Sequence, residues 1–568
     1  MKKVIELACD FETINDPLDC RVWSWGIYKV GGRDDEYRDG INLKSFFNEL
    51  YNYKCKNLKL IFHNARFDFS FLEYYLVKNL KLEWVEKKPC NGQYTSLISK
   101  EGVFYSAKIC YEDFNITVVD STKIIKNKLA NLPKMLGFDF KIKKGEIDYN
   151  MYRPIGYLPS LNEKEYQFND CKILAIAWEK LKERGYNKIT LSSNVLEFYK
   201  RDLGRKTFKA LFPVLDSEVD YFLRDGYSGG VCVVNPRYQN KKIGKGRVYD
   251  VNSLYPWAQS TQPLPYGKPV FFKGEYKESL FYPLYVSRIK VDCRLKEGHI
   301  PCIILKGGGR YIKNTYLIDT NGEMLEKTLT CIDIEILKQN YDIYKIEYID
   351  GYMFHASENM FTKFFSKLFE EKQRATEIGD IANRTFAKLE MNGLGGKFGT
   401  NSNATRKKPV YNPVDGVIHY EYIEETKETI YLPVIMFVTA HGRKKLMQAI
   451  NDNLDRFLYC DTDSIHLLGD YDAENIEVDK VKIGAWDYEL KFIEAKYIRQ
   501  KTYIEIEKKE LYDEVEVISH VKAAGLVGAN NIQGIGLDSF RIGMKHKCLK
   551  QKRVANGVVL QDTVIELK

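Results

Sequence analysis

The segment Tyr459–Ser464, with the sequence YCDTDS, constrains this chain more than any other feature. Two carboxylates, Asp461 and Asp463, flank one threonine, and apolar residues lie on both sides of the segment. If the flanking residues are strands, a tight turn presents both carboxylates at its tip, where oxygen ligands of hard cations such as Mg2+ belong. An Asp-x-Asp turn by itself is more often a solvated loop. A metal site therefore requires a partner carboxylate elsewhere in the chain.

That partner is Asp250, in the segment VYDVNSLYP. The pattern predicts a short strand over Arg247–Tyr249 that ends at Asp250, followed by a turn that Tyr255-Pro256 closes. Because Asp250 and Asp463 are far apart in the chain, only the tertiary fold can bring them together.

Length and composition limit the classes of protein. A chain of 568 residues is too long for one hydrophobic core, so we expect three or more domains. The longest apolar stretch, residues 431–440, is too short to span a bilayer, which predicts no membrane partner. Twelve cysteines without a C-x-x-C pair argue against a zinc ribbon or a disulfide framework and favour a reducing cytoplasm. Glu6 and Asp10 interrupt the N-terminal apolar run, which favours a first strand over a signal peptide.

Basic residues gather beside aromatic ones at several places. The net charge is +9, which is modest for this size but compatible with a phosphate-bearing partner. Each cluster alone fits a solvated face, but together they favour a nucleic-acid channel. The clusters are Lys200-Arg201, Arg205-Lys206, Lys241-Lys242 and the run Arg541, Lys545, Lys547, Lys550, Lys552 and Arg553.

The residue pattern changes along the chain. Strands alternate with helices from residue 1 to about 190, and this part ends in an amphipathic run over residues 163–184. A second helical block covers about 355–400. The segment after it predicts a β-hairpin that reverses at residues 412–416.

Five short motifs in order resemble those of family B DNA polymerases. DVNSLYP, KLEMN and YCDTDS resemble motifs A, B and C, YSGG at 227–230 resembles the motif that joins the exonuclease and polymerase halves, and KTY at 501–503 resembles the primer-contacting motif. Order and spacing are similar to those of the protein-primed subgroup of phages, over essentially the whole chain. The resemblance implies a multidomain α/β fold with an RNase H-like DEDD exonuclease domain followed by a right-hand polymerase (palm, fingers and thumb) with two insertions.

The resemblance also implies roles for single residues in nucleotidyl transfer. Two Mg2+ ions about 3.5–4 Å apart, with Mn2+ as a substitute, activate the primer 3′-hydroxyl and hold the triphosphate. Asp250 and Asp463 bridge these ions, Asp461 supports them, and Val251 is a further expected ligand. Tyr255 excludes a 2′-hydroxyl from below the sugar, and Lys388 reaches the triphosphate. The expected nucleotide-binding residues are Ser253, Leu254, Tyr255, Lys388 and Asn392, and the expected DNA contacts in this half are Tyr227, Gly229, Gly230, Lys501 and Tyr503.

The first 190 residues carry a second set of carboxylates. Asp10 and Glu12 lie on one face of a strand because residues two apart point the same way. Asp68 and Asp170 follow in the order of the DEDD exonucleases, and four acids can hold two metal ions. Tyr166, one helical turn before Asp170, is expected to orient the attacking water. Surface charge is the alternative for each acid alone.

Further exonuclease residues follow from the resemblance alone. Lys144 matches a catalytic lysine, and the residues that match a grip on the single-stranded 3′ end are His63, Asn64, Phe67, Ser121 and Tyr149. The family has Ser-Leu where this chain has Ser121-Thr122, so a DNA contact at Thr122 stays open.

The resemblance suggests a division of the chain and a set of partners. The expected domains are exonuclease 1–190, palm 191–261 and 427–525, first insertion 262–358, fingers 359–399, second insertion 400–426 and thumb 526–568. The first insertion contacts a terminal protein whose hydroxyl takes the first nucleotide, and the second encloses the DNA. The expected partners are template and primer DNA, dNTPs, the terminal protein and a single-stranded DNA-binding protein, for a monomer in the cytoplasm of a host bacterium.

Motif B departs from the family pattern. Family members carry Asn-Ser-Leu-Tyr-Gly where this chain has the residues 392–396, with glycine at 393, 395 and 396. On one helix Lys388, Asn392 and Gly395 share a face, so a tyrosine ring is missing from the surface that meets the new base pair. One hypothesis is a roomier pocket that tolerates modified nucleotides. The other is that a different side chain fills the gap.

Two further functions stay open on the residues alone. One is a family B polymerase that uses an ordinary primer or none. The other is a DNA-binding clamp that has lost catalysis, which the full set of metal-binding carboxylates disfavours.

Overall fold

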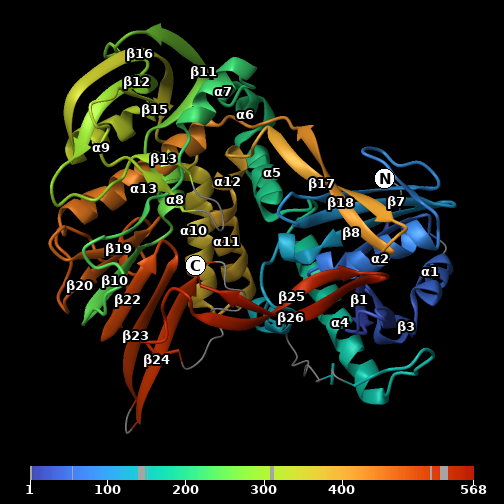
Figure 1. Cartoon of the computed structure of the whole chain (residues 1–568). Coiled ribbons are helices and arrows are strands. Elements are labelled where there is room, and N and C mark those ends of the chain that lie inside the picture. Colours follow the sequence, from blue (N-terminus) through green and yellow to red (C-terminus); the bar gives the residue numbers. More distant parts are fainter. Residues whose placement is uncertain are drawn as a thin grey trace.

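The computed structural model (Figure 1) describes residues 3–53, 55–138, 147–149, 151–307, 313–511, 514–524 and 535–567. Its N-terminal part is built on an eight-stranded sheet with the strand order β3-β2-β1-β4-β8-β7-β6-β5. Strands β1, β4 and β8 run parallel, and β1 and β2 form an antiparallel pair. The strands are β1 Ile5–Thr13, β2 Val22–Lys29, β3 Arg38–Gly40, β4 Asn57–Phe62, β5 Glu83–Trp84, β6 Gln93–Ile98, β7 Phe104–Tyr111 and β8 Phe114–Asp120.

Helices cover both faces of this N-terminal sheet. Helix α4 forms where the sequence predicts an amphipathic helical run. It begins at a capping box, in which Ser160 and Glu163 satisfy each other's backbone N–H groups. Its apolar side packs on β1 and β2 and forms one core with Ile61 and Val119 of the sheet. The helices of this part are α1 Leu43–Asn52, α2 Arg66–Lys78, α3 Leu132–Met135 and α4 Leu161–Glu183, followed by α5 Leu191–Leu203, α6 Arg205–Leu211 and α7 Ser217–Gly226.

A five-stranded antiparallel sheet, the central sheet, has the strand order β21-β10-β20-β19-β9. Its strands come from two distant parts of the chain: β9 Cys232–Val234, β10 Gly246–Val251, β19 Phe457–Asp461, β20 Ser464–Leu468 and β21 Trp486–Phe492. Helices α8 Leu254–Thr261 and α13 Pro433–Asn451 pack together beside it. The apolar stretch at 431–440 is buried, and α13 begins within it at Pro433. Among the described residues, no helix combines the length and apolar composition that crossing a bilayer requires.

Between β10 and β19 the chain builds two excursions and a pair of long helices (Figure 1). The first excursion is a four-stranded sheet in the order β11-β16-β12-β15 with one helix and a short two-stranded sheet. Its elements are β11 Leu264–Lys273, β12 Leu284–Leu295, β13 Ile304–Lys306, β14 Thr315–Tyr316, β15 Leu325–Thr330, α9 Cys331–Asn340 and β16 Tyr341–Ser357. Helices α10 Thr362–Glu377, α11 Ile381–Gly393 and α12 Gly395–Phe398 follow, and the second excursion is the hairpin β17 Asn403–Asn412 and β18 Val417–Thr426.

The C-terminal part consists of strands that return to the rest of the molecule. Strands β22 Glu494–Arg499, β23 Thr502–Leu511 and β24 Glu514–Ala523 form an antiparallel sheet beside the central sheet, and β25 Lys545–Val554 and β26 Gly557–Glu566 form a hairpin. Val558 and Val559 of this hairpin belong to the same core as α2 of the N-terminal part. The last hairpin therefore reaches back across the molecule to its beginning (Figure 1).

A cluster of charged side chains, here called the hairpin junction, fixes both hairpins to α2. The Tyr420 hydroxyl of β18 donates a 2.5 Å hydrogen bond to Glu73, and it accepts hydrogen bonds of 2.7 Å from Arg553 and 3.1 Å from Arg66. Burial raises the pKa of the Glu73 carboxyl above its usual range, and Arg553 opposes this rise. Arg553 belongs to the basic run in which the sequence suggested a nucleic-acid contact, but its guanidinium donates a hydrogen bond to Tyr420 within the hairpin junction.

Candidate active sites

The central sheet brings Asp250 and the Asp461–Asp463 turn to one edge. Asp250 pairs with Ser464 of β20 on one side and with Asp487 of β21 on the other, so β10 extends to Val251, one residue beyond the predicted end at Asp250. The backbone N–H of Val251 donates a 2.8 Å hydrogen bond to the carbonyl of Asp463. The strand–turn–strand arrangement predicted for YCDTDS is present as β19 and β20. The fold thus joins the two distant motifs.

The YSGG segment lies against one side of the turn. Thr462 has a left-handed backbone, with φ 65°, and its N–H donates to the carbonyl of Val231 at 2.8 Å. A Cβ atom on Gly230 would lie 2.7 Å from the Thr462 side chain, so only glycine fits there. A Cβ atom on Gly229, in contrast, would have no other heavy atom within 4 Å. The second glycine of YSGG therefore permits the close approach of the YCDTDS turn.

Negative charge accumulates at this edge. Burial and the carboxylates of Asp463, Glu489 and Asp487 raise the pKa of Asp250 to about 8. Burial and the neighbouring Asp461 raise the pKa of Asp463 to about 6. Asp487 and Glu489 are acids that the sequence analysis missed, and only their register on β21 next to Asp250 shows their relevance. A cation at this edge would relieve the repulsion among these carboxylates.

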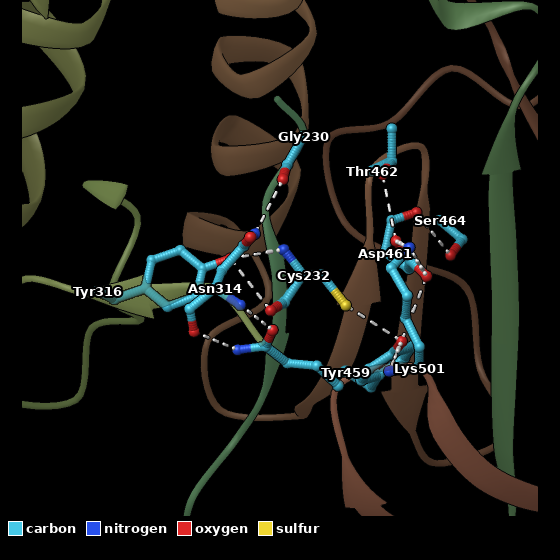
Figure 2. Close-up of polar contacts among 10 residues, drawn as sticks. Gly230, Cys232, Asn314, Tyr316, Tyr459, Asp461, Thr462, Ser464 and Lys501 are labelled. Atoms are coloured by element: carbon cyan, nitrogen blue, oxygen red, sulfur yellow. Dashed lines mark hydrogen bonds and ion pairs between the residues drawn. The ribbon is translucent and has the colours of Figure 1, made fainter. Parts of the chain in front are cut away.

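Lys501 and Tyr503 lie at the same edge. The Lys501 ammonium is 2.9 and 3.0 Å from the two carboxylate oxygens of Asp461, and the Lys501 N–H donates to the Tyr459 hydroxyl at 3.0 Å (Figure 2). The ring of Tyr503 lies 5.0 Å from that of Tyr459. Asp250, Asp461, Asp463, Lys501 and Tyr503 all line one cleft of about 820 Å³.

A buried pair ties the strand of Tyr503 to the strand of the turn. Nδ1 of His466 on β20 lies 2.5 Å from the Glu505 carboxylate on β23, and the Tyr497 hydroxyl donates to the same oxygen at 2.6 Å. Glu505 is two residues from Tyr503, and both side chains contact His466 of the central sheet. Nothing in the sequence identified this pair, because a single histidine and a single glutamate in separate strands carry no local signal.

The residues after Asp250 begin α8. Ser253 adopts a left-handed backbone with φ 53° just before the helix, and Leu254 is buried in the main core. Burial raises the pKa of Tyr255 to about 12, and Arg443, Asp463 and Asp461 lie near enough to influence it. Tyr255 packs against Gly442 of α13. Its ring therefore stands between α13 and the carboxylate edge.

Arg443 of α13 organises the YSGG segment and was missed by sequence reasoning. Its guanidinium donates to the carbonyls of Ser228 at 2.6 Å and Gly229 at 2.8 Å, and it forms a bidentate ion pair with Asp333 at 2.8 Å. The Tyr227 side chain is half-buried, and burial raises its pKa. Arginine and aspartate 110 positions apart gave no signal in the sequence.

Three cations converge on the α10–α11 pair. Lys388 and Arg384, one turn apart on α11, are exposed and share a face, and Asn392 lies one turn further on. Burial and the positive charges of Lys388 and Arg384 lower the pKa of Lys372 on α10. A cleft of about 410 Å³ is lined by Lys372, Gln373, Arg384 and Lys480. Lys372 and Arg384 are additional candidates for phosphate binding that the motif alone did not indicate.

Helix α11 ends at the glycines of motif B. It stops at Gly393, and α12 starts at Gly395, so the helix is interrupted at Leu394. Gly395 does not share the exposed face of Lys388 and Asn392 but is buried. A Cβ atom there would lie 3.3 Å from Oε1 of Gln259 and 3.4 Å from Ile435. Gln259 is 1% exposed, so this arrangement favours the hypothesis that another side chain fills the gap.

The second carboxylate set lies at the centre of the N-terminal sheet. Asp10 and Glu12 point to one face of β1, Asp68 lies in the first turn of α2, and Asp170 is in α4. Burial and the charges of Asp10 and Asp120 raise the pKa of Asp68 well above its usual range. The Gln167 amide donates to the Asp10 carbonyl at 3.2 Å and so connects α4 with β1. These acids therefore come together from three elements.

Tyr166 lies among them. Its hydroxyl is 3.1 Å from that of Tyr149, and burial, Asp170 and Glu12 raise its pKa. Tyr149 is largely exposed. Lys144, the expected catalytic lysine, lies outside the described residues.

The residues expected to grip a 3′ end surround this site. The His63 ring contacts the Ser121 hydroxyl at 2.8 Å and the Asn127 carbonyl at 2.8 Å. Asn64 has a left-handed backbone, with φ 67°, and its N–H donates to Asp120. The Phe67 ring packs 5.5 Å from that of Phe71. The Thr122 hydroxyl donates to Asp120 at 2.7 Å, so Thr122 stabilises this turn with its side chain.

Neither set forms a closed protein cage for a metal ion. Within the described ranges, no three histidine, cysteine or carboxylate side chains are grouped closely enough to enclose one. Mg2+ is usually held by one or two carboxylates together with water and substrate phosphates. An open pair of carboxylates with raised pKa values fits that kind of site.

The chain is similar to proteins of known sequence and structure over nearly its whole length. A family model described as DNA polymerase type B, organellar and viral, matches residues 160–481. The DNA polymerase of Bacillus phage Nf is 36% identical over 580 residues, covering 99% of each chain. The solved structure of phi29 DNA polymerase in an orthorhombic crystal form has a TM-score of 0.92 at 33% identity and covers 100% of both chains. Phi29 DNA polymerase complexed with primer-template DNA and incoming nucleotides has a TM-score of 0.91 at 34% identity, covering 99% of this chain and 100% of that one.

Proposed function

The chain belongs to the type B DNA polymerases of organelles and viruses, and from that premise we propose which of its residues carry the chemistry. It is a DNA-directed DNA polymerase with a 3′–5′ exonuclease, and it depends on divalent metal ions. The observation that carries the residue assignment is the meeting of Asp250 and Asp463 at one edge of the central sheet, in a cleft that Lys501 and Tyr503 also line.

At the polymerase site Asp250 and Asp463 hold two Mg2+ ions, with Val251 beside them. When bound, such ions would activate the primer 3′-hydroxyl and neutralise the charge of the triphosphate and the leaving pyrophosphate. Lys501 neutralises Asp461, which leaves Asp463 as the carboxylate of the turn that faces the ions. Tyr503 and the YSGG residues Tyr227, Gly229 and Gly230 bind DNA, with Arg443 fixing the backbone of that segment.

The incoming dNTP binds between α8 and α11. Lys388, Arg384 and Lys372 meet the triphosphate, where their charges offset the charge that develops during transfer. Asn392, Ser253 and Leu254 complete the nucleotide site, and Tyr255 excludes a 2′-hydroxyl by its ring. The enzyme's partners include primer-template DNA and dNTPs, as in the complexes of phi29 DNA polymerase.

At the exonuclease site Asp10, Glu12, Asp68 and Asp170 would hold two metal ions, which would activate a water molecule for attack on a terminal phosphodiester. Tyr166 orients the water, and His63, Asn64, Phe67, Ser121 and Tyr149 hold the single-stranded 3′ end. Lys144 is the proposed catalytic lysine. Removal of mismatched ends at this site gives proofreading.

We assign the domains by the elements they contain. Residues 1–190 are the exonuclease, 191–261 and 427–525 the palm, 359–399 the fingers and 526–568 the thumb. The four-stranded sheet of 262–358 contacts a terminal protein, and the hairpin of 400–426 encloses the DNA. The enzyme then starts a linear viral genome on a terminal-protein hydroxyl and displaces the non-template strand, as a monomer in the host bacterial cytoplasm, beside a single-stranded DNA-binding protein.

Separation-of-function variants test the two sites. Asp250→Ala is expected to abolish primer extension and to leave degradation of single-stranded DNA at the wild-type rate. Asp10→Ala is expected to do the reverse. If either variant lost both activities while keeping its thermal unfolding midpoint, or lost neither, the two-site assignment would be wrong.

The priming mode needs its own assay. Incorporation of the first nucleotide is measured with a free 3′-hydroxyl primer, with no primer, and with a candidate terminal protein. Covalent labelling of that protein is the expected result. Synthesis that requires an ordinary primer under all conditions would favour the alternative of a non-protein-primed family B enzyme.

A further inference from the structure

The helix that carries Lys388 packs its back on the N-terminal part of the molecule. Phe386 of α11 is buried in the same core as Ile173, Leu174 and Trp178 of α4, and Ala382 and Leu389 pack against that core. Lys388 and Arg384 face the other way and are exposed. One face of α11 is thus anchored on the exonuclease domain while the opposite face presents cations to the nucleotide site.

One arginine fastens this packing. Arg184, the residue that ends α4, donates to Glu390 of α11 at 2.8 Å from both Nε and Nη2. It also donates to Glu371 of α10 at 2.5 Å from Nη1 and 2.9 Å from Nη2. The same guanidinium therefore forms two bidentate ion pairs, one with each long helix of the pair. A planar fork of this kind fixes orientation as well as distance.

The Glu390 carboxylate depends on this contact. Its side chain is only 3% exposed, and its partners are Arg184 and the Tyr186 hydroxyl, which donates at 2.9 Å. A buried carboxylate is costly unless it is paired and hydrogen-bonded. Loss of Arg184 would leave two acids, Glu371 and Glu390, facing the end of α4 without their cation, so the helix pair would shift away from α4.

Helix α4 also carries the exonuclease residues Tyr166 and Asp170. One helix thus carries Asp170 of the proposed exonuclease site and, at its C-terminal end, Arg184, which binds α10 and α11. We propose that Arg184 is a positioning residue for dNTP binding, which sets the placement of Lys388 and Arg384 by clamping α10 and α11 to the exonuclease domain. This inference rests on the proposed nucleotide site.

The clamp acts on the balance between synthesis and degradation. An enzyme in which Lys388 and Arg384 are displaced binds dNTP more weakly, whereas Asp170, in the N-terminal half of α4 and away from Arg184, stays in place. The dNTP concentration at which extension overtakes degradation should therefore rise. Degradation of single-stranded DNA without dNTP should not change.

Arg184→Met tests the clamp against Lys182→Met as a matched control. Lys182 lies at the same end of α4 and pairs with Glu6 of β1, which keeps a second partner in Lys59 at 2.6 Å. We expect the KM for dNTP to rise about tenfold in Arg184→Met with a much smaller change in kcat, and to be unchanged in Lys182→Met. An unchanged KM in Arg184→Met would overturn the inference.

The double variant Arg184→Met, Glu390→Met separates positioning from stability, and it also serves if the single variant folds poorly. Apolar residues remove the unpaired buried carboxylate, so the thermal unfolding midpoint should recover toward wild type. The KM should stay raised because the fork that orients the helices is still missing. If KM returned to wild type together with the unfolding midpoint, Arg184 would have only a structural role.

Lys388→Gln distinguishes a failure of this inference from a failure of the proposed function. A raised KM for dNTP in Lys388→Gln, with an unchanged KM in Arg184→Met, would refute the clamp alone. An unchanged KM in Lys388→Gln would refute the nucleotide site and the clamp with it.

Discussion

The ammonium group of Lys501 lies 2.9 Å from Oδ1 and 3.0 Å from Oδ2 of Asp461. Asp461 directly precedes Thr462, whose backbone is left-handed. The two aspartates of the YCDTDS turn are therefore not equivalent. Asp461 already has a cation as its partner, whereas the pKa of Asp463 is raised to about 6 by burial and by Asp461. The KTY segment, proposed to contact the primer, and the YCDTDS turn, proposed to bind metal, thus share one ion pair.

Lys501→Met should weaken binding of primer-template DNA by about tenfold, because it removes both a cation near the primer end and the partner of Asp461. Gel-shift or fluorescence titration at fixed salt measures the Kd. Lys56→Met, at an exposed ion pair with Asp113, is the control and should bind DNA like wild type. Equal Kd values for the two variants would argue against a role of Lys501 at the primer.

Gly395→Tyr should destabilise the enzyme rather than change its choice of nucleotides. A Cβ atom at 395 meets Gln259 at 3.3 Å and Ile435 at 3.4 Å, and overpacking of this kind costs roughly 1–3 kcal/mol. At Gly396 the Cβ position is open, so Gly396→Tyr should retain stability. Chemical unfolding measures the difference. If Gly395→Tyr kept full stability and restricted modified nucleotides, the hypothesis of a roomier pocket would be supported instead.

Tyr420→Phe should loosen the hairpin junction. It removes the hydroxyl that binds Glu73, Arg66 and Arg553, and leaving a buried carboxylate short of a partner costs about 1–3 kcal/mol. We expect a lower unfolding midpoint and shorter products in a single-binding-event extension assay. Tyr422→Phe, two residues away and largely exposed, should change neither. Wild-type stability and product length in Tyr420→Phe would contradict a structural role of the junction.

His441→Gln should make the enzyme less sensitive to acid. Burial lowers the pKa of His441 to about 4, so the folded state keeps the ring neutral. The unfolded state binds a proton below a pKa of about 6.5, so His441 contributes destabilisation that grows as the pH falls from there toward 4. The free energies of unfolding of wild type and variant, compared at pH 7 and pH 5, measure this destabilisation by His441. A difference that does not change with pH would contradict it.

The local sequence predicted many of the helices, hairpins and turns, but few of the contacts between distant elements. The amphipathic run that became α4, the β17–β18 hairpin and the YCDTDS turn each have a short-range signal in period, cap or turn residues. The partnership of Asp250 with Asp463 rested on resemblance, because no local pattern connects strands so far apart.

The missed residues share one property, which is that their partners lie in distant elements. Asp487 and Glu489 matter because β21 pairs with β10, and Arg443 matters because α13 passes beneath the YSGG carbonyls. Gly395 was misplaced for a related reason. A continuous helix through Leu394 would place Gly395 on the face of Lys388, whereas α11 ends at Gly393 and Gly395 lies against Gln259.

The most direct test of the account is the rate of single-nucleotide incorporation under saturating Mg2+ by Asp250→Asn and Asp463→Asn, with Asp461→Asn alongside. The account predicts that the first two lose about a thousandfold or more, because each removes a carboxylate of the metal pair, whereas Asp461→Asn loses clearly less. Single-stranded exonuclease activity should be intact in all three. Incorporation by Asp250→Asn or Asp463→Asn within about tenfold of wild type would contradict the assignment of these two residues as the metal pair.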